Sequence, residues 1–141
     1  MTITARFKAE SFSGGGQDGR ILSKATGIQE QDHYWILSTW RVGRAIRLRF
    51  RLKAGDLKLG VWTHVVAVYD GKLMKLYKDG RLVGSIAKTG IIDTNANVSV
   101  WIGDNPPEVG SRRWNGLLDD VRICNRALAE SEISELSETP R

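Results

Sequence analysis

The residues that could support acid–base catalysis are few, and their spacing does not assemble a catalytic site. His64 lies inside an apolar, strand-like run with no nucleophile or acid beside it, so we expect a core histidine rather than a general base. Asp119 and Asp120 are adjacent, and neighbours on a strand point to opposite faces. A glycosidase needs two carboxylates that face one bond, about 5 to 9.5 Å apart. We therefore expect a protein that is not an enzyme, with glycoside hydrolysis as a remote alternative.

Basic and apolar residues alternate between Ala45 and Ala54, which predicts one amphipathic antiparallel strand. The basic positions are Arg47, Arg49, Arg51 and Lys53. Because arginine pairs with carboxylate and sulfate through two parallel hydrogen bonds, this face could hold an anionic polysaccharide. A solvated outer face is the plainer alternative. No aromatic residue interleaves these positions, as stacking on bases would need, so we expect no nucleic-acid partner.

Aromatic residues beside loops are the other candidates for ligand binding, because exposed rings can stack on the apolar faces of sugars. Trp40 and Trp114 lie next to loops and next to the basic residues Arg41 and Arg112–Arg113. Trp62 and Trp101 lie within apolar runs, so we expect them in the core. The candidate ligand-binding residues are Trp40, Arg47, Arg49, Arg51, Arg112 and Trp114.

The length and composition indicate one globular domain over residues 1–141. No run approaches the roughly 18 apolar residues of a membrane span, and the N-terminus lacks the apolar stretch of a signal peptide. Either the chain is intracellular or it is a piece of a longer secreted protein. Cys124 is the single cysteine, which excludes an intrachain disulfide. The net charge of +5 permits anionic partners without requiring one.

Short strand-like runs separated by turn signals predict an all-β sandwich. Asp70-Gly71 and Asp79-Gly80 predict two hairpin turns in an antiparallel meander that includes a central strand, Trp62–Tyr69. Glu130–Leu136 predicts one or two helical turns, and Ala129 at the expected cap position cannot cap, so we expect a short and frayed helix. Further strands are expected at Thr2–Glu10, Arg20–Ala25, His33–Trp40, Val98–Ile102 and Leu117–Cys124.

Three runs together resemble the laminin-G/pentraxin-like branch of the concanavalin A-like lectin/glucanase superfamily. They read WTHVVAVYDG (residues 62–71), LYKDGRLVG (76–84) and WNGLLDDVRICNRAL (114–128). The resemblance covers nearly the whole chain and implies an antiparallel jelly-roll β-sandwich. The chain differs from the family pattern at Cys124, where tyrosine is common, and at Ala129, where a capping serine is usual. From this resemblance we expect the family's first strand or two, with their F-D-x-x-x-G-like start, to be absent from this chain.

The resemblance also implies a function. We expect a non-catalytic module that binds carbohydrate, including anionic glycans, and that comes from a larger extracellular or cell-surface protein. The alternative is a domain that binds protein or spaces other domains. In related jelly rolls the aspartate that opens the last strand contributes to a calcium site, which here makes Asp119 the candidate calcium ligand.

The missing first strand bears on assembly. Without it, at least one sheet edge or apolar patch near Thr2–Glu10 and Leu117–Cys124 is uncovered. Exposed edges recruit other chains unless charge, a bulge or proline blunts them. We therefore expect self-association as a two-fold homodimer, and a monomeric sandwich with fewer strands is the alternative.

Overall fold

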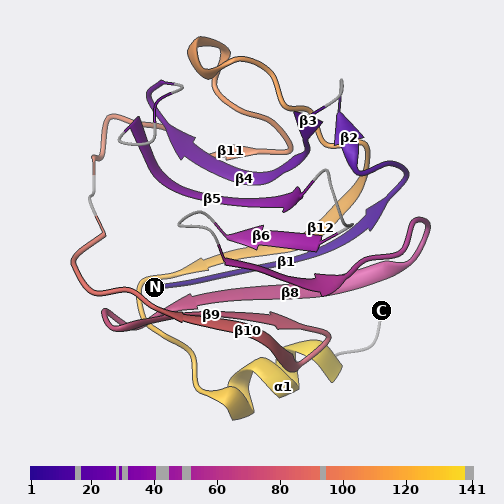
Figure 1. Cartoon of the computed structure of the whole chain (residues 1–141), viewed down its shortest axis with the longest axis vertical. Helices are drawn as coiled ribbons and strands as arrows, with labels where there is room; N and C mark the ends of the chain where they lie inside the picture. Colours follow the sequence, from indigo (N-terminus) through magenta and orange to yellow (C-terminus); the bar gives the residue numbers. More distant parts are fainter. Residues whose placement is uncertain are drawn as a thin grey trace.

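The computed structural model describes residues 1–14, 17–27, 29, 32–40, 45–48, 52–92 and 95–138. For residues 13, 14, 17, 18, 40, 45–48 and 52–55 it describes the backbone alone. These residues form two five-stranded antiparallel sheets that pack face to face, with a two-stranded ribbon of β2 (Ser13–Gly14) and β3 (Gln17–Asp18) (Figure 1). The antiparallel β-sandwich expected from the sequence is confirmed.

The first sheet has the order β10-β9-β8-β1-β12. Its strands are β1 (Thr2–Ala9), β8 (Trp62–Tyr69), β9 (Leu73–Lys78), β10 (Arg81–Ala87) and β12 (Gly116–Cys124). The predicted meander is confirmed, since β8, β9 and β10 pair in sequence order. Gly71 and Gly80 have φ of 96° and 78°, which only glycine adopts readily, so each can close a tight turn.

The second sheet has the order β11-β4-β5-β6-β7. Its strands are β4 (Arg20–Ala25), β5 (His33–Trp40), β6 (Ala45–Leu48), β7 (Leu52–Asp56) and β11 (Trp101–Ile102). The prediction of one strand over Ala45–Ala54 is wrong, because β6 and β7 pair antiparallel with Arg47 opposite Lys53. Alternation with period two continues along both arms of a hairpin, so it cannot separate one strand from two.

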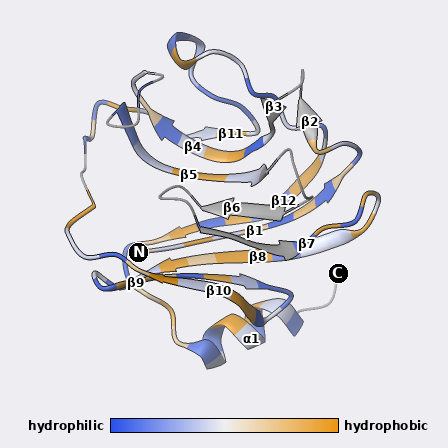
Figure 2. Cartoon of the chain, viewed as in Figure 1, coloured by the Kyte–Doolittle hydropathy of each residue, from blue (hydrophilic) through white to orange (hydrophobic). Residues whose placement is uncertain are grey.

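The core lies between the two sheets. Phe7, Leu22, Leu37, Val65 and Leu76 are each fully buried in it. Figure 2 shows hydrophobic residues concentrated along β8, whose central residues are all buried, as expected for a strand covered on both faces.

Trp101 corrects one expectation. The ring is 37% exposed, because β11 is a two-residue strand at the edge of its sheet. The strand predicted at Val98–Ile102 is accordingly reduced to Trp101–Ile102. The burial of Trp101 and the length of this strand were both overestimated, because an apolar run on an edge strand has the same sequence pattern as an apolar run in a core strand.

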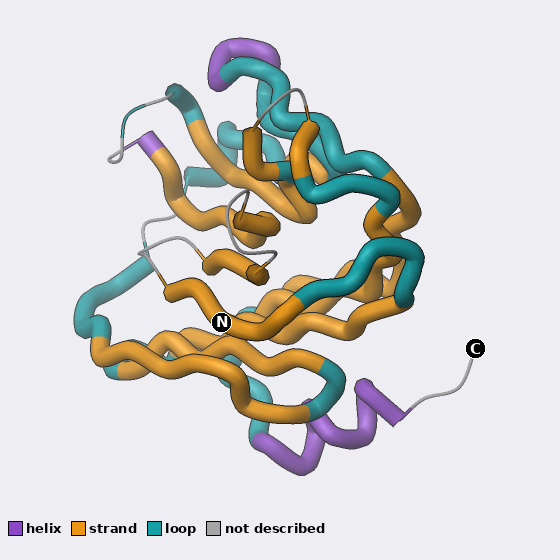
Figure 3. The backbone as a smooth tube through the Cα atoms, turned by 45° about the vertical axis from the view of Figure 1, so that its right-hand side comes forward, coloured by secondary structure: helices purple, strands orange, loops and turns teal. Residues whose placement is uncertain are grey.

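Helix α1 (Glu130–Glu138) packs on the outer face of the first sheet (Figure 3). Ile133 is fully buried there against a second cluster that includes Val66 and Tyr77. The expected frayed start is wrong, because the Glu132 carboxylate reaches back and accepts a hydrogen bond from the Ala129 amide at 2.8 Å. Within the described residues, no helix has the length and apolar character that crossing a membrane requires.

Candidate functional site

The loop of residues 103–115 joins β11 to β12 at the end of the sandwich opposite α1 (Figure 3). The Asp104 carboxylate organises it. Its oxygens accept hydrogen bonds from the amides of Asn105 and Arg112 and from the Ser111 hydroxyl. Partial burial alone would raise the pKa of Asp104, but these hydrogen bonds and nearby Arg113 outweigh it and lower the pKa below its usual value. Asp104 therefore stays ionised and holds the two ends of the loop together.

A buried polar contact fixes the loop to the second sheet. Arg20 on β4 is only 4% exposed, and its Nε donates to the Asn105 side-chain oxygen at 3.0 Å. Asn105 is also buried, and its side-chain nitrogen Nδ2 donates to the Gly110 carbonyl at 3.0 Å. Burying a guanidinium is costly unless it is hydrogen-bonded, so this contact favours one loop position.

Trp114 at the end of the loop has a packing role. Its ring meets Phe7 of the core edge-on, with centroids 5.2 Å apart and planes at 71°. The ring also lies close to Gly19, where an added Cβ would be 3.3 Å from it. Trp114 is half-buried: its indole Nε1 is covered by protein, while part of the residue is exposed to solvent.

The fold brings three of the predicted residues to this end of the sandwich. The Arg20 amide donates to the Arg112 carbonyl at 3.0 Å, and the Thr39 amide donates to the Gly19 carbonyl at 3.1 Å. Loop residues Arg112 and Trp114 thus lie beside the end of β5, where Trp40 follows Thr39. Arg47 on β6 is opposite Ser38 in the same sheet. Arg49 and Arg51 lie outside the described residues.

Two adjacent cations sit on this loop. The Arg113 side chain is 84% exposed, and its Nε lies 3.7 Å from the Asp104 carboxylate. Arg112 precedes it, with its backbone fixed by Asp104. An exposed arginine on a fixed backbone, next to a partly exposed indole, can pair with an anionic group while the ring contacts an apolar face.

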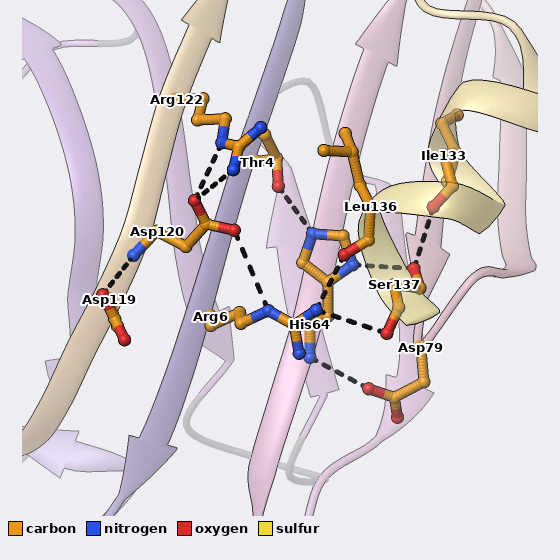
Figure 4. Close-up of polar contacts among 10 residues, drawn as sticks. All are labelled: Thr4, Arg6, His64, Asp79, Asp119, Asp120, Arg122, Ile133, Leu136 and Ser137. Atoms are coloured by element: carbon orange, nitrogen blue, oxygen red, sulfur yellow. Dashed lines mark hydrogen bonds and ion pairs between the residues drawn. The ribbon is translucent and has the colours of Figure 1, made fainter. Parts of the chain in front are cut away.

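Asp119 and Asp120 lie on β12, away from this loop. Asp119 Oδ1 accepts a hydrogen bond from the Asp120 amide at 2.7 Å, while Asp120 pairs with Arg122 at 2.7 Å and with Arg6 at 3.8 Å (Figure 4). Within the described residues, no three side chains of the types His, Cys, Asp and Glu gather as a metal group would. Calcium at Asp119 would thus draw most of its six to eight oxygens from elsewhere, and it stays a prediction.

His64 occupies a buried network beneath α1, as Figure 4 shows. Its ring is 3% exposed and lies 2.7 Å from the hydroxyls of both Thr4 and Ser137. Arg6 completes the network by donating to the Leu136 and Ser137 carbonyls at the end of α1. The expected core histidine is confirmed, although its ring binds side chains rather than backbone. Sequence reasoning missed Asp104 and Ser137, whose partners are set by loop closure and tertiary packing.

The family model for the concanavalin A-like lectin/glucanases superfamily matches residues 1–134. Adhesion G-protein coupled receptor V1 from Danio rerio is 33% identical over 136 aligned positions, covering 87% of this chain and 2% of the receptor. The chain therefore spans a very small part of that relative.

Two solved structures share the fold. The heptameric SAP-like pentraxin from Limulus polyphemus has a TM-score of 0.72 and 24% identity over 97% of this chain and 69% of the pentraxin. The CBM40 of Ruminococcus gnavus IT-sialidase, bound to α2,3-sialyllactose, has a TM-score of 0.76 and 18% identity over 96% of this chain and 81% of the module. At these identities the likeness establishes the jelly-roll fold alone.

Proposed function

Because this chain belongs to the concanavalin A-like lectin/glucanase superfamily, we propose that it is a non-catalytic module that binds carbohydrate, anionic glycans included. The proposed site is the loop of residues 103–115 with the adjoining end of β5. The observation that carries the proposal is the loop itself. Asp104 fixes its backbone, and it carries Arg112 and exposed Arg113 directly before Trp114.

Binding of a charged sugar fits this chemistry. Arg113 can donate to a carboxylate or sulfate, because its side chain is 84% exposed and its Nε lies 3.7 Å from the Asp104 carboxylate, beyond hydrogen-bond distance. The net charge of +5 adds long-range attraction for polyanions. The similar Ruminococcus gnavus module, crystallised with a sialylated sugar, supports a carbohydrate ligand. Arg47, Arg49 and Arg51 remain proposed contributors to binding.

The contacts of the two candidate catalytic acids, Asp119 and Asp120, support a non-catalytic role. Asp120 is paired with two guanidinium groups, and Asp119 binds the neighbouring backbone amide. Both carboxylates thus bind groups of this chain, whereas a pair of glycosidase carboxylates must face one scissile bond about 5 to 9.5 Å apart.

A protein-binding or spacer role is the second candidate, and exposed apolar side chains favour it. Ile91 is 96% exposed, Ile102 58% and Leu117 54%, and exposed apolar side chains of this kind can be buried against a protein partner. The relative from Danio rerio is an adhesion receptor, which supports an extracellular or cell-surface setting for the parent protein.

A glycan array read at low and physiological salt tests the proposed function. We expect selective binding of sulfated or uronic glycans that falls steeply as salt rises. Arg113→Ser should weaken binding, whereas Arg81→Ser, which removes an exposed cation from β10 in the other sheet, should not. The double variant Arg47→Ser/Arg49→Ser is compared with wild type on a heparin column. The difference in retention measures how much of the binding depends on the basic residues on and after β6. An array without hits, combined with capture of a defined protein ligand, would replace this proposal with the second candidate.

A further inference from the structure

Strand β12 ends the first sheet, and the two edges of that sheet differ. At the opposite edge β10 packs beside β7, which closes that side of the sandwich. At the β12 edge the core face continues into solvent. Ile123 is opposite Ile3 in the register, yet Ile123 is 47% exposed and Ile3 only 3%. An apolar side chain that belongs to the core face is therefore left half open at this edge.

A bulge in β12 sets which residues share a face. Thr4 pairs with Arg122 and Arg6 with Asp119, so Asp120 and Val121 together oppose Ala5. Asp120 has a positive φ of 49°, as a residue in such a bulge can. The two residues of the bulge occupy one position of the ladder.

Because of the bulge, matching residues before and after it lie on the same face of the sheet. Leu118 and Ile123 are opposite Phe7 and Ile3, so both lie on the core face. Asp119 and Arg122 are opposite Arg6 and Thr4, so both lie on the face that carries α1. Without the bulge, residues 118 and 123 would point to opposite faces, because their separation is odd.

We infer that β12 pairs antiparallel with β12 of a second copy, about a two-fold axis through the bulge. This register places Asp119 opposite the partner's Arg122, and symmetry repeats the pair. It places Leu118 opposite the partner's Ile123 on the core face and Leu117 opposite the partner's Cys124 on the other. Each pair away from the axis therefore brings together either opposite charges or two apolar side chains. The first sheet of one copy and that of its partner then form one continuous sheet.

The groups already in place are compatible with this pairing. Arg122 binds Asp120 of its own chain through Nε and one terminal nitrogen, so the other terminal nitrogen can donate to the partner's Asp119. The Arg122 side chain is 50% exposed and can reach past the edge. Asp120 approaches its symmetry mate, and Arg6 and Arg122 neutralise it there. One nine-residue strand per copy makes a small interface, so we expect a dissociation constant in roughly the micromolar range.

Cross-linking tests the register directly. Opposed residues in an antiparallel pair have Cα atoms about 4.5 to 5.5 Å apart, which a disulfide can span. Leu117→Cys should therefore form a covalent dimer with the partner's native Cys124 under mild oxidation by glutathione disulfide. Within one chain, residues 117 and 124 are roughly 20 Å apart along the strand and cannot join. Wild type, the double variant Leu117→Cys/Cys124→Ser, and Ser85→Cys on β10 are the controls.

We expect covalent dimer from Leu117→Cys alone, and light scattering should show wild-type dimer that grows with concentration. The charge reversals Asp119→Arg and Arg122→Asp should each make the protein monomeric, and their combination should restore the dimer. Circular dichroism confirms that each variant is folded. A monomer at all concentrations up to about 100 µM, or equal cross-linking of Leu117→Cys and Ser85→Cys, would overturn the inference. Neither result bears on glycan binding, so the two proposals fail separately.

Discussion

His64 on β8 and Thr4 on β1 are joined by a hydrogen bond of 2.7 Å between Nε2 and the buried hydroxyl. The other partners of the network fix its direction. The Ser137 hydroxyl donates to the Ile133 carbonyl at 2.9 Å, so its oxygen accepts from Nδ1–H of His64. Nε2 is then the acceptor for the Thr4 hydroxyl. The network that joins both strands to α1 is therefore complete when His64 is neutral.

The first prediction is a pH dependence of stability set by His64. Burial, and next the nearby Arg6, lowers the pKa of His64 from 6.5 to about 4. Between these values the unfolded chain takes up a proton that the folded chain does not. The contribution of His64 to the free energy of unfolding is full above pH 6.5 and is lost as the pH falls toward 4; it amounts to about 3 kcal/mol.

Urea unfolding between pH 7 and 4 measures this dependence. In the variant His64→Gln, the free energy of unfolding should no longer show the part of its pH dependence that comes from His64. The glutamine side chain still offers one hydrogen-bond donor group and one acceptor to the network. His33→Gln, which removes the other histidine, is the matched control and should keep that part. Identical slopes for wild type and His64→Gln would contradict the assignment.

The second prediction concerns Gly116, where β12 begins beside Ala9. Its φ is +135°, and an added Cβ would clash with the Lys8 carbonyl oxygen and lie 3.0 Å from the Ala9 Cα. Gly116→Ala should therefore lower the free energy of unfolding by about 3 kcal/mol or more. Gly71→Ala also has a positive φ but nothing within 4 Å, so about 1 kcal/mol is expected. Thermal melts of both variants check this, and equal losses would rule out close packing at Gly116.

The third prediction concerns calcium at Asp119. An ion that binds only the folded state must raise the melting temperature by mass action, and Asp119→Asn should abolish the rise. Glu108→Gln removes an exposed carboxylate elsewhere and is the control. If millimolar calcium leaves the wild-type melting curve unchanged, calcium at Asp119 is eliminated, while the hydrogen bond from the Asp120 amide to the Asp119 carboxylate stands.

Local signals in the sequence predicted much of the fold. Asp70-Gly71 and Asp79-Gly80 predicted their turns correctly, because few dipeptides readily adopt the required backbone angles. The β6–β7 hairpin was not predicted, since Arg47 and Lys53 keep the same alternation as a single strand would. The helix cap was missed because it comes from Glu132, three residues after Ala129, whose carboxylate accepts a hydrogen bond from the Ala129 amide.

The candidate site was less predictable than the fold. Arg112 and Trp114 were found because basic and aromatic residues adjoin there. Their position depends on Asp104 and on the contact between Arg20 and Asn105, which are separated by 85 residues. Ser137 meets His64 across 73 residues. Pairs so far apart leave no local pattern, so only the folded chain reveals them.

The central claim is that the loop of residues 103–115 binds carbohydrate. The most direct measurement is a nitrogen–proton NMR titration with the strongest oligosaccharide from the glycan array. The account predicts saturable shifts of the backbone amides of Asp104, Asn105 and residues 108–114 and of the Trp114 indole N–H, reduced in Arg113→Ser and unchanged in Arg81→Ser. Saturable shifts confined to other parts of the chain, or no saturable shifts with any array-selected glycan, would contradict it.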